Sequence, residues 1–202
     1  MKNTVKNVFA FMAVAVLAFP LIGAIGPPGE GLHEGGAVFG PATPSTPAQE
    51  QATALLKQVA TRARATADRA ETLQSYARGR QVNIQAHAYE LNRAKDSVNA
   101  IGADLSELQE LHADALPWQQ MLINRLQPML GSLASQTTVA IEHLNENPGS
   151  LYTTAYLEYK DAIRNMSAHA DEVSDLISVN VDYAKARGNL DRLNASSTGE
   201  VS

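Results

Sequence analysis

The chain contains no cysteine among its 202 residues. Disulfide bonds, thiol catalysis, lipidation of a cysteine and haem attachment through a C-x-x-C-H motif are therefore excluded. Aromatic residues make up only 5% of the chain, and all four phenylalanines lie before residue 40. The remainder is rich in alanine and leucine, which favour helices. A fold of this composition must be held together by packing alone.

Catalytic and nucleotide-binding motifs are also missing. The sequence has no G-x-S-x-G, no H-E-x-x-H and no glycine loop of the kind that binds phosphate. Acidic residues exceed basic residues, 21 to 16, which disfavours contact with nucleic-acid phosphates. We therefore predict a protein that is not an enzyme and does not bind nucleic acid.

Residues 1–26 have the layout of an export signal, because Lys2 and Lys6 precede an uncharged and largely apolar stretch over residues 7–25. This stretch fits a cleaved signal peptide, and it is also just long enough to remain as a membrane anchor. Both alternatives place the rest of the chain in the periplasm, on the extracytoplasmic face of the membrane, or in the medium. Residues 27–46 are dense in glycine and proline and are predicted to be a flexible linker.

Beyond the linker, apolar residues recur at alternating steps of three and four, which predicts four long helices with heptad patterns. The predicted spans are 47–77, 83–113, 117–145 and 153–194, followed by a disordered tail at 196–202. Thr46, Pro47 and Gln49 form a capping box with proline at the first helical position. Because short connections make neighbouring helices antiparallel, residues 47–195 are predicted to form an up-down-up-down four-helix bundle.

The fourth predicted helix exceeds the others by about ten residues, or about 15 Å, and would project beyond the bundle or pack on a partner. Its apolar stripe is predicted to trail to Leu190 and Leu193. Asn180 occupies a core position on that stripe, where a buried asparagine can set register or partner choice. Tyrosines combine an apolar ring with a polar tip and suit interfaces. We therefore predict interaction residues at Asn180 and at three tyrosines near the helix start, Tyr152, Tyr156 and Tyr159.

The segment "NIQAHAYELN" places His87 on the apolar stripe of the second helix. A turn near residue 115 would bring His87 level with His143 on the third helix. One hypothesis is a metal site formed by these two histidines. The alternative, which we favour, is a histidine that is hydrogen-bonded within the core, to Gln74, a tyrosine hydroxyl or water. His143 lies beside the stripe of its own helix, so its direction is left open.

A second set of residues suggests a cofactor or small-ligand site. Gly102, Pro128 and His169 are predicted to lie at similar heights, with Met129 and Met166 nearby. A kink at the proline opposite a glycine would leave space for a ligand, and histidine with methionine is an axial pair for haem. The alternative is that the methionines simply fill an irregular core. We predict no bound cofactor, with metal binding, haem binding or small-ligand sensing as alternatives.

Several stretches resemble a group of uncharacterised exported bacterial all-helical proteins. These are, in order, "HAYELN", "PWQQ", "IEHLNENP", the tyrosine-rich start of the last helix, and "VDYAKARGNLDRL". The resemblance covers about residues 50–195 and implies a bacterial, extracytoplasmic, helical protein with no assigned catalytic residue. Leu116 departs from the pattern, since a capping serine or threonine is expected there.

Composition, helix pattern and resemblance together predict a non-catalytic cell-envelope bundle. Its predicted partner is an envelope protein or a second copy of the chain. Membrane attachment is predicted only if the N-terminal segment is retained.

Overall fold

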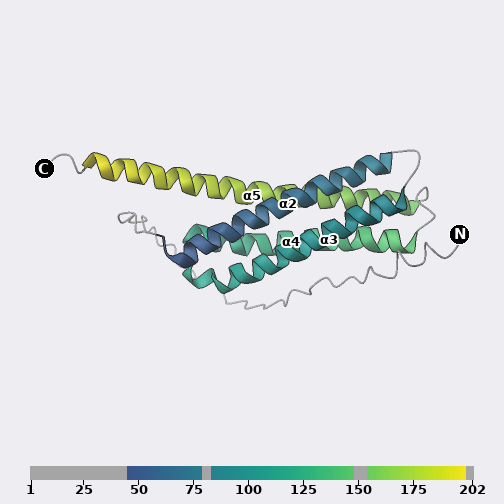
Figure 1. Ribbon diagram of the computed structural model, residues 1–202, viewed down its shortest axis with the longest axis horizontal. Helices are drawn as coiled ribbons and strands as arrows, with labels where there is room; N and C mark the ends of the chain where they lie inside the picture. Colours follow the sequence, from purple (N-terminus) through teal and green to yellow (C-terminus); the bar gives the residue numbers. More distant parts are fainter. Residues whose placement is uncertain (1–44, 79–82, 148–153, 199–202) are drawn as a thin grey trace, which may run out of the picture.

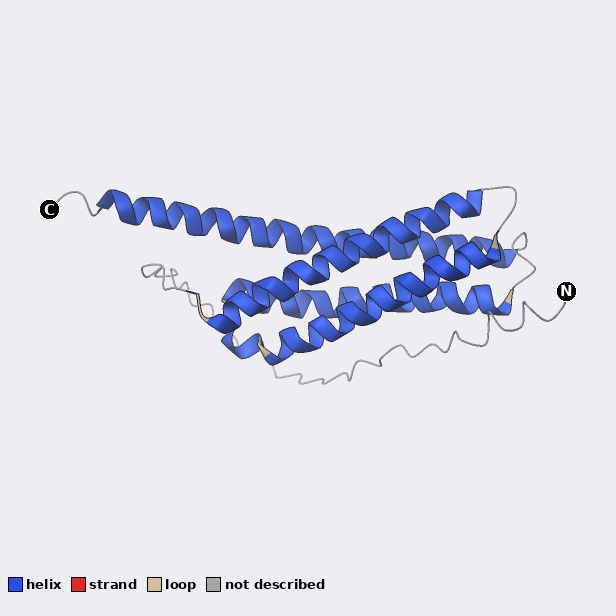
Figure 2. Ribbon diagram, in the orientation of Figure 1, coloured by secondary structure: helices blue, strands red, loops and turns tan. Residues whose placement is uncertain are grey.

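The computed structural model describes residues 45–78, 83–147 and 154–198. Nearly all of these lie in four helices, α2 (Pro47–Arg78), α3 (Ile84–Glu110), α4 (Pro117–Glu146) and α5 (Thr154–Thr198). A short 3-10 helix, η1 (His112–Asp114), follows α3. The described residues contain no strand (Figure 2). The prediction of an all-α chain with four long helices is confirmed.

The four helices pack as a bundle in which α2 and α4 each contact both α3 and α5. Figure 1 shows the helices side by side, with α5 continuing past the ends of the others toward the C-terminus. One connected cluster of buried apolar residues draws on all four helices. The described part of the chain therefore has a single shared core.

The start of α2 forms as the sequence predicts. The Thr46 hydroxyl accepts the Gln49 N–H at 3.3 Å, and the Gln49 side-chain oxygen accepts the Thr46 N–H at 3.1 Å. Pro47 follows as the first helical residue, where no N–H partner is needed. The buried face of α2 is dominated by small side chains, namely Ala52, Ala60, Ala63, Ala67, Ala70 and Ala77. Such a face allows a short distance between helix axes.

The turn between α3 and α4 differs in detail from the prediction. α3 ends at Glu110 rather than at residue 113, because the next residues tighten into η1. Leu116 offers no side-chain oxygen, and its N–H donates instead to Oε1 of Gln119 at 2.8 Å. The Gln119 amide nitrogen donates at 2.9 Å to both the Gln49 carbonyl and the Thr53 hydroxyl. This completely buried glutamine therefore caps α4 and ties its start to the start of α2.

α5 has 45 residues, against 32 in α2, 27 in α3 and 30 in α4. Its buried residues run at core spacing from Tyr159 to Val181. The prediction that this stripe trails to Leu190 and Leu193 is wrong, because these side chains are 60% and 65% exposed. The helix also continues to Thr198, so residues 196–198 of the predicted disordered tail are helical, and residues 199–202 lie outside the described residues.

Within the described ranges, no helix combines the length and the apolar character that a bilayer crossing requires. Residues 7–25, the predicted signal or anchor, and nearly all of the predicted linker lie outside those ranges.

Candidate functional site

His87 is completely buried near the start of α3, and its Nδ1 lies 2.7 Å from the hydroxyl oxygen of Tyr159 on α5. Tyr159 is completely buried as well. The ring of Tyr76 on α2 packs edge-on against the imidazole, with centroids 5.7 Å apart. The structure thus shows a histidine that is hydrogen-bonded within the core.

His143, near the end of α4, turns toward the same tyrosine. It is 8% exposed, and its ring stacks on Tyr159 with a centroid distance of 5.5 Å and an interplanar angle of 23°. The His87 ring lies 5.6 Å from the Tyr159 ring. Both predicted histidines therefore contact one residue that was not part of the predicted pair. We call His87, His143 and Tyr159 the histidine–tyrosine cluster.

Burial sets the charge states of His87 and Tyr159. It lowers the pKa of the His87 imidazole from 6.5 to about 4, because an imidazolium ion would lose its hydration there. Burial also raises the pKa of the Tyr159 phenol above its ordinary value, and the nearby Tyr156 adds to the effect. His87 and Tyr159 are therefore both neutral near pH 7.

One ring nitrogen of each histidine has no partner. Nε2 of His87 and Nε2 of His143 are buried without a hydrogen bond from any described residue. A neutral imidazole nitrogen can coordinate a metal. However, no group of three or more His, Cys, Asp or Glu side chains within the described ranges is arranged to hold a metal ion. Two imidazoles alone fall short of the four ligands of a structural zinc site.

The residues of the predicted haem or small-ligand site divide between core and surface. Met166 is completely buried, and Met129 packs against the same core. Pro128 is exposed on α4. His169 is half-buried, and its Nδ1 lies 4.0 Å from a carboxylate oxygen of Glu172 on the next turn of α5. The one contact described for the His169 imidazole is thus with Glu172 of its own helix, and its pairing with Met129 or Met166 stays a prediction.

The predicted tyrosine interaction surface also needs correction. Tyr159 lies in the core, so its side chain is not available to a partner. Tyr156 is half-buried, and its hydroxyl donates to the Ala77 carbonyl on α2 while Lys160 Nζ lies 5.5 Å from its ring centroid. Tyr152 lies outside the described residues.

Asn180 does not occupy the core position predicted for it. Its side-chain nitrogen donates to the Leu176 carbonyl of its own helix at 2.7 Å, and the residue is half-buried. The adjacent Val181 takes the core position and is 8% exposed. The prediction assigned the core position to Asn180, three residues after Ile177. In the structure the core stripe takes a step of four here, from Ile177 to Val181.

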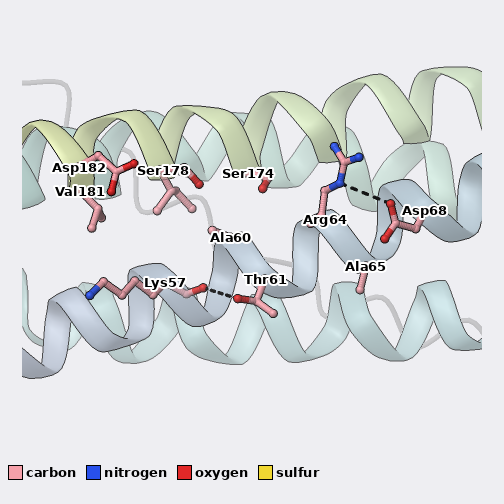
Figure 3. Close-up of a pocket in the computed structure, with 11 residues that line it drawn as sticks. Lys57, Ala60, Thr61, Arg64, Ala65, Asp68, Ser174, Ser178, Val181 and Asp182 are labelled. Atoms are coloured by element: carbon pink, nitrogen blue, oxygen red, sulfur yellow. Dashed lines mark hydrogen bonds and ion pairs between the residues drawn. The ribbon is translucent and has the colours of Figure 1, made fainter.

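A groove of about 700 Å³ lies between α2 and α5. Figure 3 shows Lys57 and Thr61 on its α2 side and Ser174 and Ser178 on its α5 side. The guanidinium of Arg64 in this groove already contacts two carboxylates, Asp68 at 3.4 Å and Asp171 at 2.7 Å. Alanine, serine and threonine side chains line much of the rest of the groove, together with Lys57 and Asp182.

Four of the nine exposed large apolar side chains among the described residues lie in the C-terminal half of α5, on the side away from the core. Val179, Tyr183, Leu190 and Leu193 are 68%, 65%, 60% and 65% exposed. Two further residues extend the pattern at alternating steps of three and four: exposed Ala186, and Leu176, which is half-buried and packs against the core at the edge of this surface. We call these six residues the outer stripe. At 100° per residue the outer stripe is centred about 150° around the helix from Ile177, which is completely buried.

Sequence analysis missed the outer stripe because it assigned Leu190 and Leu193 to the core stripe. The core stripe of α5 ends at Val181, and the outer stripe overlaps it over residues 176–181 before it continues to Leu193. The outer stripe is visible in the sequence as a second set of apolar residues at heptad spacing. The sequence alone does not show which of the two stripes is covered by other helices, because this depends on where the neighbouring helices lie and end.

The fold and these surfaces define a class of protein, an all-helical bundle with one long helix that presents an exposed apolar face. No family model, curated protein or solved structure matches the chain. Function is therefore inferred from the contacts and surfaces described above.

Proposed function

We propose that this protein is a non-catalytic, exported helical bundle of the cell envelope that acts by binding another protein chain. The observation that carries the proposal is the outer stripe of α5. Contiguous exposed apolar surface is typical of interaction sites. Heptad spacing is the pattern by which one helix recognises another.

The proposal includes the antiparallel up-down-up-down order of the helices. Three contacts between α2 and α3 support it, because the residue numbers rise along one helix as they fall along the other. These are Arg69 with Glu90 at 3.7 Å, Arg62 with the Ala100 carbonyl at 2.9 Å, and Gln58 with Asp104 at 3.2 Å.

The proposal also includes export. The basic residues Lys2 and Lys6, followed by the apolar stretch at 7–25, support it, and so does a fold without thiols. Mass spectrometry of the mature N-terminus, combined with cell fractionation, tests this part. Recovery of the uncleaved chain in the cytosol would contradict it.

Photo-crosslinking in the native host tests the interaction. A photoreactive amino acid at Leu190 is expected to give crosslinked adducts. The same substitution at Leu157, which is 57% exposed on α5 but off the outer stripe, is expected to give none. Absence of adducts from Val179, Tyr183 and Leu190 alike would overturn the proposal.

A second candidate function, metal or haem binding, is favoured by the two buried and unpartnered Nε2 atoms of His87 and His143. Elemental analysis, an absorption spectrum of protein from its own host, and thermal shifts with copper, zinc and haem test it. A colourless, metal-free protein whose melting temperature none of these additions changes would rule it out.

A further inference from the structure

We propose that the outer stripe of α5 binds the outer stripe of a second copy of this chain, forming an antiparallel two-helix coiled coil. Its two-fold axis passes between residues 184 and 185. This inference rests on the proposed interaction function and names the partner. It is carried by the spacing of the stripe, the sizes of its side chains and the distribution of charge along α5.

The spacing fits a coiled coil. Leu176, Tyr183 and Leu190 fall at heptad position a, and Val179, Ala186 and Leu193 fall at position d. The stripe runs for about 27 Å at 1.5 Å per residue. It is continuous over this length, and no charged residue interrupts it.

The sizes of the side chains favour antiparallel pairing. About the proposed axis, Tyr183 of one copy lies opposite Ala186 of the other, so the largest residue meets the smallest. The remaining layers pair Leu176 with Leu193 and Val179 with Leu190. In-register parallel pairing would place tyrosine against tyrosine and alanine against alanine, giving one crowded layer and one empty layer.

The charge along α5 favours the same orientation. Residues 171–182 contain four acidic residues and no lysine or arginine, namely Asp171, Glu172, Asp175 and Asp182, and one of these, Asp171, already pairs with Arg64 of α2. Residues 183–198 contain three basic residues and one acidic residue, namely Lys185, Arg187, Arg192 and Asp191. Antiparallel pairing sets the acidic half of each α5 beside the basic half of the other. Parallel pairing would set charges of the same sign side by side, closer than the Debye length of about 8 Å, so they would repel each other.

The residues that flank the outer stripe are compatible with this arrangement. About the same axis, each charged flanking residue faces a neutral amide or hydroxyl side chain. The facing pairs are Asp182 with Asn189, Arg187 with Asn180, and Asp175 with Ser196. No like-charge pair is formed, so an acidic protein can associate with itself through this face.

The bundle leaves room for the second copy. From Val179 to Leu193 the outer stripe points away from the side of α5 that packs on α2 and α4, and only Leu176 also touches the core, so the two bundles would lie on opposite sides of the paired helices. Figure 1 shows the C-terminal part of α5 running beyond the other helices. A membrane surface is a poorer occupant, because this part of α5 has no tryptophan or phenylalanine and few basic residues.

The mass of the full chain, purified as its host processes it, tests self-association. Light scattering on a size-exclusion column is expected to show a dimer, and Leu190→Asp is expected to lower the mass about twofold. Leu157→Asp makes the same change at a similarly exposed leucine and is expected to stay dimeric. Circular dichroism verifies that both variants are folded. A monomeric wild type, or equal loss of mass in both variants, overturns the inference.

Crosslinking through introduced cysteines tests the orientation, and the absence of native cysteine keeps the background clean. Val179→Cys and Leu190→Cys chains carrying different tags are mixed and oxidised. Antiparallel pairing predicts disulfides between the two variants and few within either one. Disulfides within each variant would show parallel pairing and overturn the inference.

The photo-crosslinking at Leu190 separates this inference from the proposed function. A monomeric wild type whose Leu190 crosslinks to a different protein would overturn self-association and leave the interaction function standing. A monomeric wild type with no adduct at the outer stripe would overturn both.

Discussion

His87 and Asp104 are both polar residues of the core, and their burial is compensated in different ways. The histidine stays neutral and uses one hydrogen bond to Tyr159. The carboxylate of Asp104 is paired with the Arg62 guanidinium and accepts a hydrogen bond from Gln58 at 3.2 Å. Burial raises the pKa of Asp104, and the attraction of Arg62 acts in the opposite direction. These two sites give separate predictions.

Tyr159→Phe removes the hydroxyl partner of His87 and leaves Nδ1 buried without a hydrogen bond. We expect the free energy of unfolding to fall by about 1–3 kcal/mol. Tyr183→Phe makes the same change at an exposed tyrosine and is expected to have almost no effect. Urea denaturation of both variants measures the difference, and equal stabilities would contradict the role given to the buried hydroxyl.

The lowered pKa of His87 makes stability depend on pH. Because the folded-state pKa of about 4 lies below the unfolded value of 6.5, the unfolded chain binds the proton first as pH falls. Stability is therefore complete above about pH 6.5 and decreases toward pH 4, by about 3 kcal/mol in total. His87→Phe is expected to flatten this part of the stability–pH curve. An unchanged slope in that variant would assign the effect to other groups.

Arg62→Met leaves the buried Asp104 carboxylate without its counterion. We expect a loss of about 2 kcal/mol, less than for a fully buried pair because Arg62 is partly exposed. The double variant Arg62→Met, Asp104→Leu is expected to recover most of that stability. Arg164→Met, which breaks an exposed pair with Asp161, serves as the control with almost no loss. A double variant no more stable than the single one would contradict this account.

At the scale of whole elements, the sequence predicted where the helices begin more closely than it predicted which of their side chains are covered by other helices. Pro47 and Pro117 begin their helices where predicted, because proline suits the first helical position. The position of His87 in the core also followed from periodicity. Its partner Tyr159 did not, since that contact depends on how α5 is rotated against α3. The exposure of Leu190 did not either, since it depends on which face of α5 turns toward the bundle.

Removal of residues 188–202 from α5 is expected to leave the bundle intact. This end of the helix contributes no described buried side chain to the core. In a Leu190→Asp background, where self-association is already removed, a chain that ends at Arg187 should unfold within about 0.5 kcal/mol of the longer chain. Thermal denaturation measures this, and a loss of several kcal/mol would show that the end of α5 packs on the bundle.

At the scale of the molecule, one core shared by all four helices implies that they unfold together. Trp118, the only tryptophan, packs against this core at the start of α4 and reports on it by fluorescence. Its thermal transition is expected to coincide with the loss of helix seen by circular dichroism. Two separated midpoints would instead indicate independently folding parts.

The alanine face of α2 has a mechanical consequence for the whole bundle. Its alanines interlock weakly, so resistance to sliding of α2 along its own axis comes from the larger buried side chains, such as Leu56 and Leu73, and from polar contacts. Polar contacts hold its register at both ends, where Gln119 binds the Gln49 carbonyl and the Tyr156 hydroxyl binds the Ala77 carbonyl. A shift of one helical turn, about 5.4 Å, would break both contacts at once. These two end contacts act together with the contacts of Arg62 and Gln58 along the middle of the helix to fix the axial position of α2.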